Sequence, residues 1–110
     1  MAEEPRKLQY CVNGEWLTSK TDKYMPVSDS STGEVFAEAP CWTKDEVEEA
    51  IQNAHWAFQS WSGLPIQKRT QVIFRWKQLL GDNAEELTHL CSRELGKNLD
   101  EARGEIVKII

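Results

Sequence analysis

Residues 34–63 read EVFAEAPCWTKDEVEEAIQNAHWAFQSWSG, and this stretch decides the fold class because its apolar period changes partway through. Up to Pro40, apolar residues occupy alternate positions, as they do in a β-strand. Beyond Pro40 they recur every three or four positions, which is the period of an α-helix. The helical stripe consists of Val47, Ala50, Ile51, Ala54, Phe58 and Trp61. The change of period indicates a fold that contains both strands and helices.

The start of this helix is marked by Thr43 and Glu46, which form the S/T-x-x-E pattern of a capping box. The Thr43 hydroxyl is expected to accept a hydrogen bond from the Glu46 amide, and the Glu46 carboxylate to accept one from the Thr43 amide. Ser62 and Gly63 are expected to end the helix.

Upstream, the pattern predicts two small β-hairpins. The first covers residues 8–17, LQYCVNGEWL, where Asn13-Gly14 is the favoured two-residue turn. The second pairs residues 23–27, KYMPV, with residues 34–40, EVFAEAP, across the turn-forming run SDSSTGE. Residues 1–7 are expected to be a flexible N-terminus.

Downstream, the pattern predicts three more helices, which gives about four in all. One runs from about Ile66 to Leu80 and ends at Gly81-Asp82. Asn83 and Glu86 are the cap signature of the next helix, and Gly96 ends it. The expected inward-facing residues of these two helices are Val72, Ile73, Trp76, Leu79 and Leu80, and then Leu87, Leu90 and Cys91.

The last helix begins at Asn98, with Glu101 three positions later, and its apolar pattern continues to the final residue. Leu99, Ala102, Ile106, Ile109 and Ile110 share one face, and no helix-ending Gly, Asn or Pro follows them. We therefore expect a chain truncated within its last helix. We also expect it to self-associate, or fold poorly, through the last three of these residues.

Composition excludes several classes of protein. The chain has 13 basic and 18 acidic residues, a net charge of −5, and no basic stripe, so nucleic acid is not an expected partner. The first residues lack the features of a targeting peptide, and no apolar run has the length of a membrane span. The expected compartment is the cytoplasm.

The candidate metal ligands are isolated from one another. Cys11, Cys41 and Cys91 have no tight spacing, which argues against a disulfide framework or a zinc site. His55 and His89 each stand alone in a helical segment, so a metal site is not expected. Structural roles are expected for all three cysteines.

Three stretches together resemble the opening of the aldehyde dehydrogenase superfamily. They are residues 13–40, with the NGEW-like turn and the STGEV turn and strand; residues 43–87, with the A-x-x-A-F-x-x-W run and Arg69; and residues 94–106, ELGKNLDEARGEI. In the turn, Asp29 and Ser30 stand where Asn and Pro are usual in the family. Residues 19–23 and 75–80 favour the methylmalonate-semialdehyde dehydrogenase branch, which acylates coenzyme A.

The resemblance implies an α/β fold, in which residues 8–110 are the N-terminal part of a Rossmann-like NAD(P)-binding domain. The intact relatives oxidise an aldehyde to an acid or acyl-CoA through a cysteine thioester, with NAD or NADP, and are usually homo-oligomers. The family's catalytic cysteine and general base match no residue here, and no G-x-G-x-x-G run is present. No catalytic or cofactor-binding residue is therefore expected within this chain.

Glu94 and Glu105 are expected to form salt bridges. The resemblance also implies a site for a monovalent cation. Its ligands would be the main-chain carbonyls of Val27 and Ser28 and the side chain of Glu105. Two alternatives to a dehydrogenase fragment remain open for the chain as a whole. One is a small stand-alone helical interaction module, whose last helix docks a partner, and the other is a regulatory fragment that joins full-length subunits.

Overall fold

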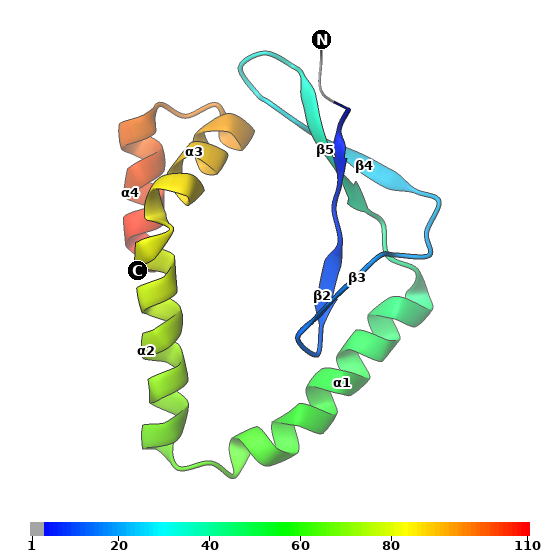
Figure 1. The fold of residues 1–110 in the computed structure, drawn as a ribbon, viewed down its shortest axis with the longest axis vertical. Helices are drawn as coiled ribbons and strands as arrows, with labels where there is room; N and C mark the ends of the chain where they lie inside the picture. The colour runs from blue at the N-terminus through cyan, green and yellow to red at the C-terminus, as the bar shows by residue number, and fades with distance from the viewer. Residues whose placement is uncertain (1–3) are drawn as a thin grey trace. The chain divides into compact units, whose positions relative to one another are not determined.

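The structure, a computed structural model, describes residues 4–110 (Figure 1). The chain divides into two compact units. The first comprises the residues up to 27 together with residues 35–63, and the second comprises residues 28–34 and 64–110. Mixed strands and four helices confirm the α/β class expected from the sequence.

A three-stranded sheet lies in the first unit, in the order β1 (Arg6–Lys7), β5 (Val35–Pro40), β4 (Tyr24–Ser28). The second predicted hairpin is present, because Asp29 N donates to Glu34 O at 2.8 Å and Cys41 N donates to Lys23 O at 2.9 Å. These two bonds make β4 and β5 antiparallel neighbours.

Strand β1 corrects the expectation of a flexible segment before Leu8. Arg6 pairs with Ala37 in a parallel register, and Leu8 N donates to Glu38 O at 2.9 Å. The open edge of β5 explains the pairing, since its free backbone groups need partners. Residues 1–3 of the expected flexible segment lie outside the described residues.

The first predicted hairpin is confirmed as β2 (Tyr10–Val12) and β3 (Glu15–Leu17), with Cys11 opposite Trp16. Asn13 has φ 53° and Gly14 has φ 76°, the left-handed values that a tight hairpin turn of this kind requires. The hairpin lies against helix α1, and Tyr10 contacts Trp42 with their ring centroids 4.3 Å apart.

Helix α1 spans Lys44–Ser62 and is closed by Gly63. Both halves of the predicted capping box are formed: Glu46 N donates to Thr43 Oγ1 at 3.3 Å, and Thr43 N donates to Glu46 Oε2 at 2.9 Å. The sequence therefore located this helix at both ends.

The second unit contains α2 (Ile66–Asp82), α3 (Ala84–Leu95) and α4 (Leu99–Ile109). Helix α2 includes Gly81 and Asp82, which were expected to break it. Asn83 does not cap α3 through its side chain, because that side chain donates to Leu79 O at 2.8 Å. Asn98 does cap α4, since its Oδ1 accepts from Glu101 N at 2.9 Å.

Helices α3 and α4 pack against each other and form the core of the second unit. Ala102 and Ile106 are buried, whereas Leu99 and Ile109 are exposed. The predicted apolar face of the last helix is therefore only partly free, and Ile106 is not available for the self-association that the sequence suggested.

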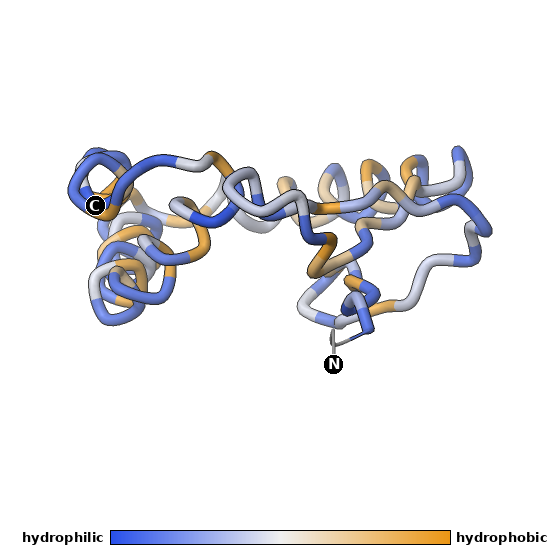
Figure 2. Tube along the Cα trace, turned by 90° about the horizontal axis from the view of Figure 1, so that it is seen from above, coloured by the Kyte–Doolittle hydropathy of each residue, from blue (hydrophilic) through white to orange (hydrophobic). Residues whose placement is uncertain are grey.

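Large apolar side chains on α1 and α2 are open to solvent, contrary to the inward-facing stripes predicted for them. No residue of α2 is buried, and Val72, Ile73, Trp76 and Leu79 are all at least half exposed. Hydrophobic and hydrophilic segments alternate along the chain (Figure 2), but nothing within the same unit covers the apolar faces of α1 and α2. None of the described helices has the combination of length and apolar character that a bilayer span needs.

Candidate functional site

The SDSSTGE turn (residues 28–34) and the end of α3 (residues 93–97) meet in the second unit, and we call this contact the turn–helix junction. The carboxylate of Asp29 accepts hydrogen bonds from the amides of Ser31 and Thr32, at 2.8 and 3.2 Å, which shapes the turn. Its other oxygen lies 3.4 Å from Arg93 Nε. Ser30 donates from its amide to Arg93 O at 3.0 Å and from its hydroxyl to Glu94 O.

Gly96 allows the close approach at this junction. It has φ 70°, the left-handed conformation of a helix C-cap, and its amide donates to Ser92 O at 2.8 Å. A Cβ added at Gly96 would lie 3.2 Å from Ser30 Cβ. The ELGK motif at the end of α3 is therefore packed against Ser30 of the turn.

Glu105 lies within α4, and two lysines form salt bridges with its side chain. Lys97 Nζ is 2.8 Å and Lys108 Nζ is 3.3 Å from Glu105 Oε1. These bonds lower the pKa of Glu105, and the bond to Glu105 raises the pKa of Lys97. The salt bridge expected for Glu105 is confirmed.

The cation site expected at Val27, Ser28 and Glu105 stays a prediction. The charged ligand of that site, Glu105, is paired with the ammonium groups of Lys97 and Lys108. This pairing disfavours the binding of a further cation there. Among the described residues, no three or more His, Cys, Asp or Glu side chains are grouped so as to hold a metal ion.

The first unit contains a buried carboxylate, Glu46, which joins the loop after the β2–β3 hairpin to α1. Glu46 accepts from Ser19 Oγ at 2.7 Å and from the Lys20 amide at 2.7 Å, in addition to its capping-box bond from Thr43. The backbone bonds from Lys20 and Thr43 lower the pKa of Glu46 to about 2. Burial, with the negative charge of Glu46, raises the pKa of Tyr10. All of these contacts stabilise the charged carboxylate, so Glu46 is a structural anchor and not a proton donor or acceptor.

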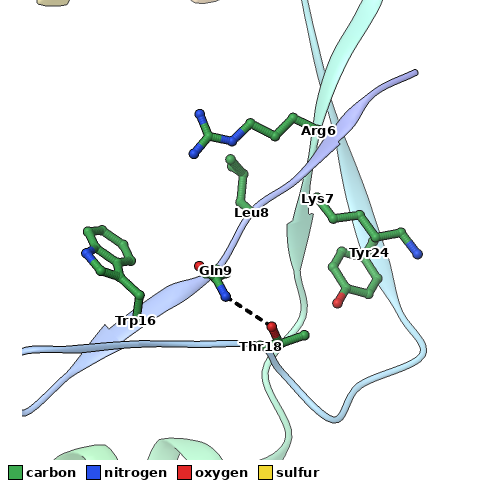
Figure 3. Close-up of a pocket in the computed structure, with 7 residues that line it drawn as sticks. All are labelled: Arg6, Lys7, Leu8, Gln9, Trp16, Thr18 and Tyr24. Carbon is green, nitrogen blue, oxygen red and sulfur yellow. Dashed lines mark hydrogen bonds between the residues drawn. The ribbon is translucent and has the colours of Figure 1, made fainter. Parts of the chain in front are cut away.

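A cavity of about 540 Å³ in the first unit opens beside β1 (Figure 3). It is lined by Arg6, Lys7, Leu8, Gln9, Trp16, Thr18 and Tyr24. Gln9 Nε2 donates to Thr18 Oγ1 at 3.1 Å, and Lys7 Nζ lies 5.0 Å from the centre of the Tyr24 ring. Figure 3 shows Arg6 and Lys7 directed to opposite sides of the strand, so their charges do not converge. The sequence did not reveal this cavity, because β1 was not predicted.

The three cysteines are free thiols in separate places. Cys11 is exposed on β2, and Cys41 and Cys91 are half-buried. His55 and His89 are exposed. The structure brings none of these five side chains together into a nucleophile–base pair within the part of the chain it describes.

Residues 16–110 match the model of the aldehyde dehydrogenase family, which is most of the chain. This chain belongs to the aldehyde dehydrogenase family. The turn–helix junction joins two of the stretches that resemble the family, at residues 13–40 and 94–106.

Several curated relatives of this chain are malonate-semialdehyde dehydrogenases. The chain is 45% identical over 103 residues to malonate-semialdehyde dehydrogenase of Bacillus velezensis, and 46% identical over 101 residues to that of Listeria monocytogenes. These matches cover 94% and 92% of this chain, but 21% of each relative. The chain thus spans about a fifth of the length of the curated relatives it matches.

Solved structures of aldehyde dehydrogenases share the fold. One is a protein assigned as methylmalonate-semialdehyde dehydrogenase from Sinorhizobium meliloti in complex with NAD, with TM-score 0.87 and 29% identity over 94% of this chain and 21% of that one. Another is the NADP-dependent glyceraldehyde-3-phosphate dehydrogenase of Bacillus halodurans with NADP, with TM-score 0.87 and 30% identity over 92% and 21% of the two chains. These neighbours support the α/β fragment fold expected from the sequence.

Proposed function

We propose that this chain forms the N-terminal, outer part of the dinucleotide-binding domain of a semialdehyde dehydrogenase. Its substrate class is malonate or methylmalonate semialdehyde, and its oxidant is NAD or NADP. The observation that carries the proposal is the 45% identity to malonate-semialdehyde dehydrogenase over nearly the whole chain. The fold shared with an NAD complex of the methylmalonate-semialdehyde branch supports it.

The residues of this chain do not fit a dinucleotide cradle by themselves. The positive-φ glycines, Gly14, Gly33 and Gly96, lie in three separate turns, and the sequence contains no G-x-G-x-x-G run. We therefore assign no step of hydride transfer to these residues. Their role in the enzyme is to support the fold through the Glu46 anchor and the turn–helix junction.

The setting that we propose for the enzyme is the cytoplasm, and the state a homo-oligomer of dehydrogenase subunits. Neither a membrane nor a nucleic acid is proposed as a partner. The net charge of −5 supports the second of these choices, since it disfavours binding to phosphate backbones.

A chimera tests the proposed function. Residues 8–110 of this chain would replace the matching segment of the Bacillus velezensis malonate-semialdehyde dehydrogenase. We expect NADH formation with malonate semialdehyde within about tenfold of the parent enzyme, a loss of about 1.4 kcal/mol or less in transition-state stabilisation. A chimera that is folded but inactive would refute the assignment.

The 110-residue chain alone is the matched control. It is expected to reduce neither NAD nor NADP with any aldehyde. Steady turnover by the chain alone that disappears in a Cys41→Ser variant would overturn this expectation, because it would place a nucleophile within this segment.

A further inference from the structure

One face of α2 has a regular composition with a single exception. Ile66, Arg69, Ile73, Trp76 and Leu80 follow one another at spacings of three and four, so they share one side of the helix. We call this set the α2 face. Ile66, Ile73 and Trp76 are 66%, 51% and 59% exposed, and α2 has no buried residue. An exposed apolar face of this kind marks a surface that binds another molecule.

Arg69 is the exception, because it is a cation among apolar side chains. Its Nε atom is buried and has no hydrogen-bond partner among the described residues. A buried donor without a partner is unfavourable, and native structures contain few of them. The missing acceptor is therefore expected to come from whatever covers the α2 face.

We propose that the α2 face binds a polypeptide segment that presents apolar side chains and one carboxylate, and that this carboxylate pairs with Arg69. The segment belongs to the remainder of the dehydrogenase, so this inference rests on the proposed function. Arginine suits the role because its planar fork can bind both oxygens of a carboxylate and completes its hydrogen bonds in one contact.

The length comparison identifies the occupant as a part of the enzyme. This chain covers 21% of the chain of each solved neighbour while keeping their fold at TM-score 0.87. In proteins of that length, the rest of the polypeptide is about four times as long as the part that this chain matches. Segments of that remainder are available to cover α2. A continuous polypeptide can supply both the apolar contacts and the carboxylate.

Charge also favours an acidic occupant. Among the residues that define the α2 face, Arg69 is the only charged one, so a segment with one negative charge is complementary to this face. A lipid bilayer is the weaker candidate, because Arg69 lies in the middle of the face that would enter the apolar layer.

The chimera with the Bacillus velezensis enzyme provides the test, with Arg69→Met as the variant and Arg75→Met as the matched control. Arg75 lies on the same helix, is exposed, and falls outside the α2 face. In the chimera, Arg69→Met is expected to lower the midpoint of thermal unfolding by about 5 °C, because it leaves the partner carboxylate buried without its cation. Arg75→Met is expected to change it by less than about 1 °C.

Two further measurements sharpen the result. Arg69→Lys in the chimera should recover part of the lost midpoint, since it keeps the charge but not the fork. In the 110-residue chain alone, Arg69→Met should leave stability unchanged or raise it, because there it only removes an unpartnered donor.

The outcomes separate the two proposals. An active chimera in which Arg69→Met and Arg75→Met behave alike would overturn the Arg69 assignment and leave the proposed function standing. An inactive but folded chimera with the Arg69-specific loss would do the reverse. An insoluble chimera would contradict both. A dimer of the 110-residue chain that Arg69→Met dissociates, or binding of that chain to anionic vesicles through Arg69, would show a different occupant and overturn the inference.

Discussion

Glu46 Oε2 accepts a hydrogen bond of 2.7 Å from Ser19 Oγ, across 27 positions of sequence, and both side chains are buried. The same carboxylate accepts from the backbone of Lys20 and Thr43. One side chain thereby fixes both the loop after the β2–β3 hairpin and the first turn of α1. The carboxylate of Glu46 accepts these three hydrogen bonds, and the two from the backbone lower its pKa to about 2.

Replacement of Glu46 by Gln should loosen this part of the first unit. The amide has nearly the same shape but loses the charge, and its NH2 group cannot accept the hydrogen bond that one of the two carboxylate oxygens accepts. We expect hydrogen exchange at the Lys20 and Thr43 amides to accelerate on the order of tenfold. Glu48→Gln, an exposed change on the same helix, should leave both rates unchanged. Equal rates in the two variants would contradict the anchoring role.

The same carboxylate predicts a pH dependence of stability. The folded pKa of Glu46 is about 2, below its usual value of 4.5, so its contribution is complete above pH 4.5. It is lost as the pH falls from 4.5 towards 2, because the unfolded state then binds a proton at Glu46 while the folded state keeps the carboxylate charged. Denaturant unfolding measured at several pH values should show this loss in the natural chain, and a smaller one in Glu46→Gln. Parallel curves for the two proteins would refute it.

The turn–helix junction predicts opposite effects at two glycines of the second unit. Gly96→Ala should destabilise the unit by about 1–2 kcal/mol, because alanine disfavours φ 70° and its Cβ would approach Ser30. Gly104→Ala should stabilise it by about 0.5–1 kcal/mol, because this glycine is inside α4 with open space around it. Urea titration followed by circular dichroism would measure both changes. If both substitutions changed the free energy of unfolding in the same direction, the described surroundings of Gly96 or Gly104 would be contradicted.

Two asparagines at helix N-termini should also differ. Asn98→Ala removes a cap bond to Glu101 N and should cost about 1 kcal/mol. Asn83→Ala removes only an exposed bond to Leu79 O and should cost less than about 0.5 kcal/mol. The helix content at 222 nm during denaturant unfolding reports both. A larger cost at Asn83 would mean that its side chain caps α3 after all.

The exposed apolar side chains of α1 and α2 predict that the 110-residue chain self-associates. Ile51, Phe58, Ile73 and Trp76 are all more than half exposed. Sedimentation velocity should show mass increasing with concentration, and the double change Ile73→Gln with Trp76→Gln should reduce it. This association is non-specific, so Arg69→Met should not affect it. A monomer with a sharp cooperative melt would instead favour the stand-alone module considered from the sequence.

Local signals in the sequence predicted most of the elements. Asn13-Gly14, the Thr43–Glu46 box, Gly96 and Asn98 each act within a few residues, and the structure confirms all four. Asn83 is the exception, because its side chain had a competing acceptor at Leu79, one turn back. A short polar side chain can bond in either direction, and sequence spacing does not decide between the two.

The contacts that the sequence did not predict join residues far apart in the chain. The pairing of Arg6 with Ala37, the bond of Ser19 to Glu46 and the ion pair of Asp29 with Arg93 depend on tertiary approach. Periodicity also could not tell which apolar faces are covered within this chain. Ala102 and Ile106 are buried by α3, whereas Ile73 and Trp76 have the same pattern and remain exposed.

The rate of NADH formation by the chimera with malonate semialdehyde tests the central claim most directly. If residues 8–110 form the N-terminal part of a semialdehyde dehydrogenase, they should replace their counterpart in the Bacillus velezensis enzyme and keep at least about a tenth of its rate. A soluble, folded chimera with a rate at the level of the buffer alone would contradict the account.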